Sequence, residues 1–178
     1  MHSQQIGLLV LMAVLGAGVI GSYLQGFSAH PGSADKLWGG VTGGLRYMNY
    51  VLMTGAAVGF FLFSYWLLFR ADPDTVTVFG GPGYWMFFII FIVILVPSIL
   101  WMPFLFAHLG SGGNGWWLAV RVVLAFVGLG SLALLAAIIT ASPGDSGVAY
   151  WLAVVGAGLF ALQTAVNDMF IWPALFEA

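Results

Sequence analysis

Few side chains in this sequence could do acid–base or ligand chemistry, and the most conspicuous of them lie inside long apolar stretches. Only two full charges stand within such stretches: Arg121 in the fourth and Asp168 near the end of the fifth. Ionisable groups in lipid are costly and commonly face a cavity, a partner or the interface. We therefore expect Arg121 and Asp168 to pair and join two helices, to reach the interface, or to anchor a bound ligand.

Further polar and aromatic candidates gather at the same end of the molecule. Consecutive spanning helices alternate in direction, so the end of the third, the start of the fourth and the end of the fifth meet on one side. That side, here called side B, places His108 and Asn167 near the charged pair, beneath a connection that carries Trp38 and Arg46. We expect any site to open toward side B, opposite side A, which holds Met1.

Two histidines on side B, His30 and His108, are candidate axial ligands for a haem iron. The chain has no cysteine, and therefore no thiolate nucleophile and no covalent haem attachment motif. It also lacks a His-Glu-x-x-His, a Gly-x-Ser-x-Gly and a phosphate loop. The sequence therefore predicts no catalytic residues and no required cofactor, and it leaves a porphyrin or haem open as a bound ligand.

One tryptophan stands out among eight because of its neighbours. Trp101 lies between Pro97 and Pro103, and prolines interrupt the backbone ladder of a helix and can open a concavity. Indole rings around such a concavity suit a flat apolar ligand. Five others fall at the ends of apolar stretches, where aromatic belts meet the lipid headgroups: Trp85, Trp116, Trp117, Trp151 and Trp172.

The composition defines the class of protein that must position these residues. Of 178 residues, 62% are hydrophobic, only ten are charged, and the mean hydropathy is +1.06. A soluble domain carries about a quarter charged residues, so a soluble globular enzyme is excluded. Four cations on a chain of net charge −2 also exclude a nucleic-acid binder. The sequence predicts an integral membrane protein whose main partner is the lipid bilayer.

Five stretches approach or exceed the roughly 20 apolar residues that a spanning helix needs. They are residues 6–24, 47–69, 84–107, 116–139 and 149–172. None shows the alternation of a barrel strand, so we predict a single all-α membrane domain, a five-transmembrane-helix bundle. The first connection, residues 25–46, is too long for a simple turn, and we expect it either to fold back over the helix ends or to be disordered.

Small residues recur at every fourth position in three of these stretches, which lets helix backbones approach closely in lipid. They are Ala13, Ala17 and Gly21 in the first, Gly55 and Gly59 in the second, and Ala153, Ala157, Ala161 and Ala165 in the fifth. Packing within one bundle explains them. A homodimer seam, best placed on the fifth helix, is the alternative.

Two short motifs resemble the tryptophan-rich sensory protein and translocator protein family. The stretch from Tyr50 to Ala57 resembles the Tyr-x-x-Met-Gly-x-Ala of that family with one residue inserted. The stretch from Trp101 to Phe106 resembles its Trp-Ser-Pro-Leu-Phe-Phe, with Ser98 where the family usually has Asn. A weaker match is Asn167 followed by a tryptophan. The first connection departs from the family pattern, because it holds one tryptophan and lacks the run of prolines.

This resemblance implies a helix bundle whose pocket, under the first connection, accepts tetrapyrroles, sterols or similar apolar molecules. We therefore expect a membrane receptor or carrier that binds a flat apolar ligand near Trp101, with Arg46, Arg121 or His108 meeting any carboxylate of that ligand. Tyr50, Ser98, Asn167, Asp168 and Trp38 complete the expected binding residues. One alternative is an accessory subunit of a larger membrane complex. The other is a membrane enzyme acting on a sterol-like or isoprenoid substrate with His108 or Asp168 as proton donor.

The few charges also predict an orientation. Side B carries Lys36, Arg46 and Arg121, whereas the side A loops carry mostly acidic residues and Arg70. Positively charged loops favour the cytoplasm. We expect the C-terminus in the cytoplasm and the N-terminus outside.

Overall fold

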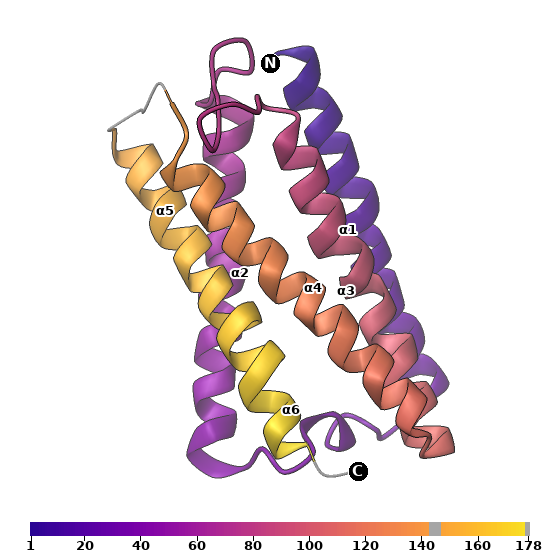
Figure 1. The fold of residues 1–178 in the computed structure, drawn as a ribbon. Coiled ribbons are helices and arrows are strands. Elements are labelled where there is room, and N and C mark those ends of the chain that lie inside the picture. Colours follow the sequence, from indigo (N-terminus) through magenta and orange to yellow (C-terminus); the bar gives the residue numbers. More distant parts are fainter. Residues whose placement is uncertain (143–146, 177–178) are drawn as a thin grey trace.

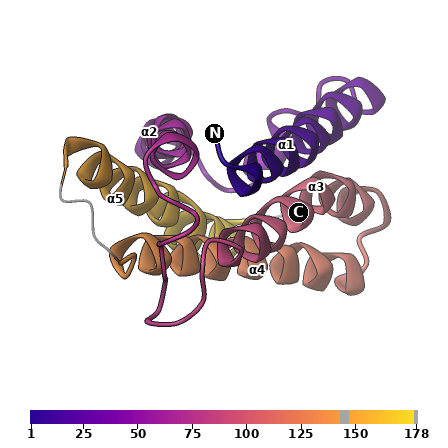
Figure 2. The same cartoon turned by 90° about the horizontal axis from the view of Figure 1, so that it is seen from above.

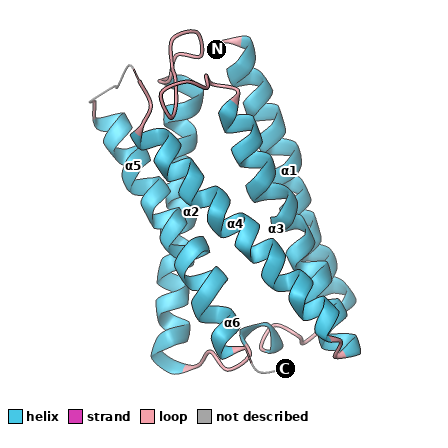
Figure 3. Cartoon of the chain, viewed as in Figure 1, coloured by secondary structure: helices cyan, strands magenta, loops and turns pink. Residues whose placement is uncertain are grey.

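The computed structural model describes residues 1–142 and 147–176, and this part of the chain is a helix bundle without a β-strand (Figures 1 and 3). Five segments are long and apolar enough to cross a membrane, which confirms the predicted five-helix, multi-pass membrane fold. They are α1 (Ser3–Ala29), α2 (Gly43–Phe69), α3 (Met86–Ser111), α4 (Asn114–Ile139) and a fifth segment from α5 (Val148–Ala161) through a π-helix (Leu162–Ile171) to α6 (Trp172–Leu175).

The helices extend beyond most of the predicted bounds, because polar and glycine residues at their ends still take helical backbone. The largest change is in the first connection. The helix α1 continues to Ala29 and α2 begins at Gly43, so the connection shrinks from residues 25–46 to 30–42. Arg46 therefore belongs to the first turn of α2. The third segment starts two residues later than predicted, at Met86.

The five segments form a ring when viewed along the bundle (Figure 2). The helix α1 packs mainly along α3, α3 along α4, α4 along α5 and the π-helix, and α5 along α2. Contact between α1 and α2 is slight. The N-terminus and the C-terminal end of α6 lie at opposite ends of the bundle, as five crossings require (Figure 1).

The tightest helix contact joins α2 and α5 through two glycines. A Cβ placed on Gly156 would lie 2.7 Å from the backbone oxygen of Gly59, so neither position has room for a side chain. The alanines of the α5 ridge, from Ala153 to Ala165, are buried within the chain. That ridge therefore serves packing inside the bundle. The ridge of Ala13, Ala17 and Gly21 on α1 is exposed. A homodimer contact through small residues would need an exposed ridge such as this one.

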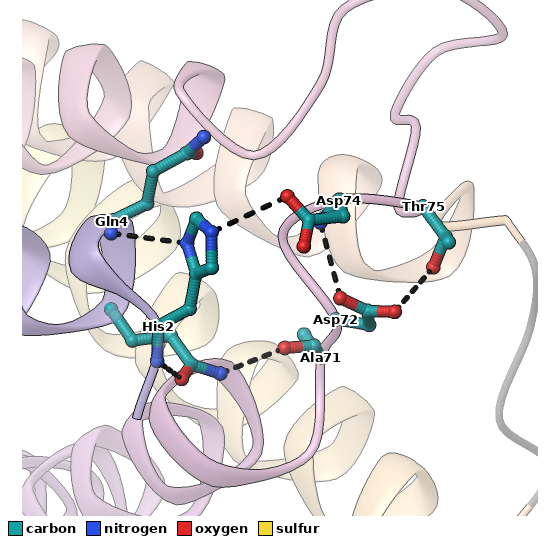
Figure 4. Close-up of polar contacts among 7 residues, drawn as sticks. His2, Gln4, Ala71, Asp72, Asp74 and Thr75 are labelled. Atoms are coloured by element: carbon teal, nitrogen blue, oxygen red, sulfur yellow. Dashed lines mark hydrogen bonds and ion pairs between the residues drawn. The ribbon is translucent and has the colours of Figure 1, made fainter.

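Polar contacts tie the start of α1 to the loop between α2 and α3 at side A (Figure 4). The Gln5 side-chain amide donates a hydrogen bond of 2.9 Å to the backbone oxygen of Ala71. The imidazole of His2 lies 3.3 Å from the Asp74 carboxylate and also caps α1 by accepting from the backbone N–H of Gln4. These bonds fix the upper end of α1, which is otherwise held mainly by α3.

The contact between α2 and α5 can be tested with two glycines on one helix. Gly156→Ala is expected to lower the free energy of unfolding by about 1–3 kcal/mol, because the new methyl group overpacks the contact with Gly59. Gly158 has open space around its Cα. Gly158→Ala is therefore the matched control, expected to leave stability unchanged or raise it by about 0.5–1 kcal/mol. Equilibrium unfolding in mixed micelles measures both, and equal stabilities would contradict the packing described.

Candidate ligand-binding cavity

A cavity of about 540 Å³ lies between the helices toward side B. Every spanning segment contributes to its wall, and the first connection covers it with Ala34, Leu37 and Trp38. Its volume falls within the range of about 300–1000 Å³ that small-molecule sites commonly have. The sequence-based expectation that this connection either folds back or is disordered resolves in favour of folding back.

Aromatic rings form much of the wall. Trp101 of α3 lies between Tyr23 of α1, at 5.6 Å between ring centroids, and Trp172 of α6, at 5.9 Å. On the side of the first connection, Trp38 meets Tyr50 edge to face at 5.1 Å. All five rings line the cavity. They offer flat apolar faces from several directions, an arrangement suited to a ligand with a planar or polycyclic body.

The first connection is held over the cavity by α6. The indole N–H of Trp172 donates to the backbone oxygen of Leu37 at 3.1 Å, and the backbone N–H of Gly40 donates to Leu175 at 2.9 Å. Trp172 is 6% exposed, so its assignment to the membrane belt was wrong. Trp85, Trp116 and Trp151 are exposed near the helix ends, as belt residues are expected to be.

Arg46 fastens the connection from the α2 side. Its guanidinium group lies 2.6 Å from the Asp35 carboxylate and 4.9 Å from the centre of the Trp38 ring. The cation is thus engaged by the connection itself, and Arg46 does not line the cavity. Its role in the structure is to position Trp38.

A chain of buried amides connects α2 to the π-helix. The side-chain N–H of Asn167 donates to the Asn49 side-chain oxygen at 2.5 Å and to the Asp168 carboxylate at 3.0 Å. The Gln163 amide donates to the same carboxylate oxygen, Asp168 Oδ1, at 2.8 Å. Nearby, Thr164 donates to Ser131 of α4 at 2.6 Å. Asn49, Gln163, Thr164 and Asp168 line the cavity, so its polar wall is concentrated on α2 and the π-helix.

Arg121 and Asp168 do not pair. Among the described residues the ion pairs are His2 with Asp74 and Arg46 with Asp35, and Arg121 is exposed. It follows directly after Val120, which faces the interior, and so points away from the bundle near the start of α4. A long cationic side chain at that depth can reach the interface.

The histidines also lie outside the cavity wall that the structure describes. His108 is buried, with its ring 5.3 Å from Trp117, and its Nδ1 is 3.4 Å from the backbone oxygen of Gly113. His30 stacks on Phe106 at 4.1 Å. Within residues 1–142 and 147–176, no group of three His, Cys or acidic side chains could hold a metal ion.

The cavity thus contains Trp38, Tyr50, Ser98, Trp101 and Asp168 of the expected residues, with Asn167 directly behind Asp168. The Ser98 hydroxyl donates to Ile94 of its own helix at 2.7 Å. Sequence reasoning missed Tyr23, Asn49, Gln163 and Thr164. Asn49 and Gln163 could have been found as amides within apolar stretches, at the same depth as Asp168.

Comparisons of the chain with protein-family models, with curated proteins and with solved structures found no match. The geometry of the cavity is therefore the basis for assigning a function.

The bond from Trp172 to Leu37 can be tested with a substitution that keeps an aromatic side chain. Trp172→Phe removes the N–H donor, and a buried hydrogen bond contributes about 1 kcal/mol. We expect the backbone amides of residues 30–42 to exchange hydrogen for deuterium about fivefold faster. Trp116→Phe, at an exposed tryptophan, should leave that exchange unchanged. Unaltered exchange in Trp172→Phe would show that the connection is held by other contacts.

Proposed function

We propose that this protein is a membrane receptor or carrier that binds a flat apolar ligand, sterol-like or tetrapyrrole-like, in the cavity beneath the first connection. The observation that carries this proposal is the cavity itself, about 540 Å³ and lined by seven aromatic side chains from different segments. The contiguous rings of Tyr23, Trp101 and Trp172 offer one aromatic wall to a planar molecule, and the pair of Trp38 and Tyr50 offers another contact. The polar wall on the π-helix can fix its orientation.

Two further features support binding. The connection over the cavity is attached to α6 by two hydrogen bonds, so a ligand can enter without the bundle coming apart. The slight contact between α1 and α2 leaves a second route, from the lipid. Membership of the translocator protein family remains part of the proposal. Two residues of the motifs, Tyr50 and Trp101, line the cavity, as does Ser98, which stands where the family usually has Asn.

Ligand binding is tested by quenching of tryptophan fluorescence in lipid nanodiscs. The probes are a fluorescent sterol analogue and protoporphyrin. Trp101→Ala is expected to raise the Kd of a bound probe at least about tenfold, because a central tryptophan anchor contributes about 2 kcal/mol or more. Trp151→Ala, at an exposed ring, is the control. Equal affinity in both variants would place the ligand elsewhere, and no quenching by either probe would overturn the proposal.

We further propose that side B faces the cytoplasm, because Lys36, Arg46 and Arg121 lie there. The absence of cysteine allows single-cysteine labelling. A membrane-impermeant maleimide added to intact cells is expected to label Gly81→Cys on side A, and to label Ser28→Cys on side B only after permeabilisation. The reverse pattern would invert the orientation.

A further inference from the structure

The described cavity wall holds one carboxyl group and no basic side chain. Among the described residues that line it, Asp168 is the only aspartate, glutamate, lysine or arginine. The two arginines that the sequence placed near this site do not reach Asp168. Arg46 pairs with Asp35, and Arg121 is exposed. A carboxyl group within a membrane helix normally has a partner, because lipid cannot solvate it. Nothing in the described part of the chain provides a cation for it.

The hydrogen bonds to Asp168 leave half of the carboxyl group free. Both amide donors, from Gln163 and Asn167, reach the same oxygen, Oδ1. No hydrogen bond reaches Oδ2 among the described residues, although Asp168 belongs to the cavity wall. The amides therefore hold the carboxyl group in place while its second oxygen remains available to a bound molecule.

A neighbouring acceptor is also free. Gln163 is 6% exposed and lines the cavity, and its side-chain oxygen has no hydrogen-bond partner. Buried acceptors of this kind are costly unless a donor reaches them. Asp168 Oδ2 and Gln163 Oε1 are thus two acceptors without a donor among the described residues. A protonated amine supplies several donors and the opposite charge.

The aromatic wall is suited to the same chemical group. Faces of Trp and Tyr rings attract cations, and aromatic cages are a recurring site for ammonium groups. Tyr23 lines the same cavity as Asp168, and its ring packs against Trp101. A cation at Asp168 would therefore lie beside aromatic rings. The indole N–H of Trp101, in the same wall, is buried without a hydrogen-bond partner among the described residues.

From this geometry we infer that the cavity selects a lipophilic amine, with its protonated nitrogen at Asp168 and Gln163 and its apolar body between the aromatic rings. This inference rests on the proposed function and narrows it to ligands that carry a cation. It also reverses the expectation that basic residues meet a ligand carboxylate. The cavity wall holds none of Arg46, Arg121 or His108.

Three probes with the same naphthalene ring and different head groups test the sign of the charge. They are 2-(2-naphthyl)ethylamine, 2-(2-naphthyl)ethanol and 2-naphthaleneacetate. Equilibrium dialysis against the full-length protein in phosphatidylcholine nanodiscs, with empty nanodiscs subtracted, gives the three Kd values. We expect the amine to bind at least about tenfold more tightly than the alcohol, as a charge-assisted hydrogen bond allows, and the carboxylate to bind most weakly.

Variants locate the charge. Asp168→Asn is expected to remove the difference between amine and alcohol while the alcohol still binds. Asp74→Asn, a carboxylate at side A far along the bundle, should preserve that difference. If Asp168→Asn fails to fold, the order of the three probes on the unaltered protein still decides the matter.

The outcomes separate this inference from the function on which it rests. If amine and alcohol bind equally, the preference for a cation is overturned and the cavity remains a binding site for apolar molecules. Tightest binding of the carboxylate, or an amine preference that survives in a folded Asp168→Asn variant, also overturns the inference. If none of the probes binds above the level of empty nanodiscs, and the sterol analogue and protoporphyrin fail as well, both proposals fall.

Discussion

Lipid offers no hydrogen bonds, so a polar group inside the bundle must find its partner within the protein. The chain meets this constraint by concentrating its polar side chains in one place. Asn167 of the π-helix donates to Asn49 on α2 and to Asp168, and Thr164 of the π-helix donates to Ser131 on α4, at 2.5–3.0 Å. These bonds join three segments around the cavity. The remaining segments, α1 and α3, contribute almost entirely apolar and aromatic surface there.

The number and order of the spanning helices could be predicted from the sequence, because each apolar stretch matches the bilayer thickness. Their ends could not, since capping residues such as His2 lie outside the apolar run. Depth was also predictable, and Trp38, Trp101 and Asp168 do lie together toward side B. Rotation about each helix axis was not. A helix that is apolar on all sides has no periodicity to show which face is inside.

That missing rotation explains the particular errors. The sequence places Arg121 and Asp168 at similar depth in the membrane. In the structure Arg121 is exposed, whereas Asp168 lines the cavity. Trp172 has the position of a belt residue, but its side of the helix faces the first connection. The amides Asn49 and Gln163 carried a usable signal, because uncharged polar residues in a spanning stretch seldom face lipid. Partners for such groups become visible only when the helices are placed side by side.

The π-helix gives the fifth segment a property that an α-helix of equal length would lack. Its backbone bonds span five residues, as in the bond from Trp172 N–H to Asn167, so each turn holds more residues than an α-helical turn. The π-helix thereby changes the direction in which the side chains of α6 point around the helix axis. The glycine contact on α5 and the indole on α6 can then both face inward, although α-helical spacing alone would set them out of step. The ten π-helical residues thus set the rotation of α6, which holds the first connection, relative to α5, which packs on α2.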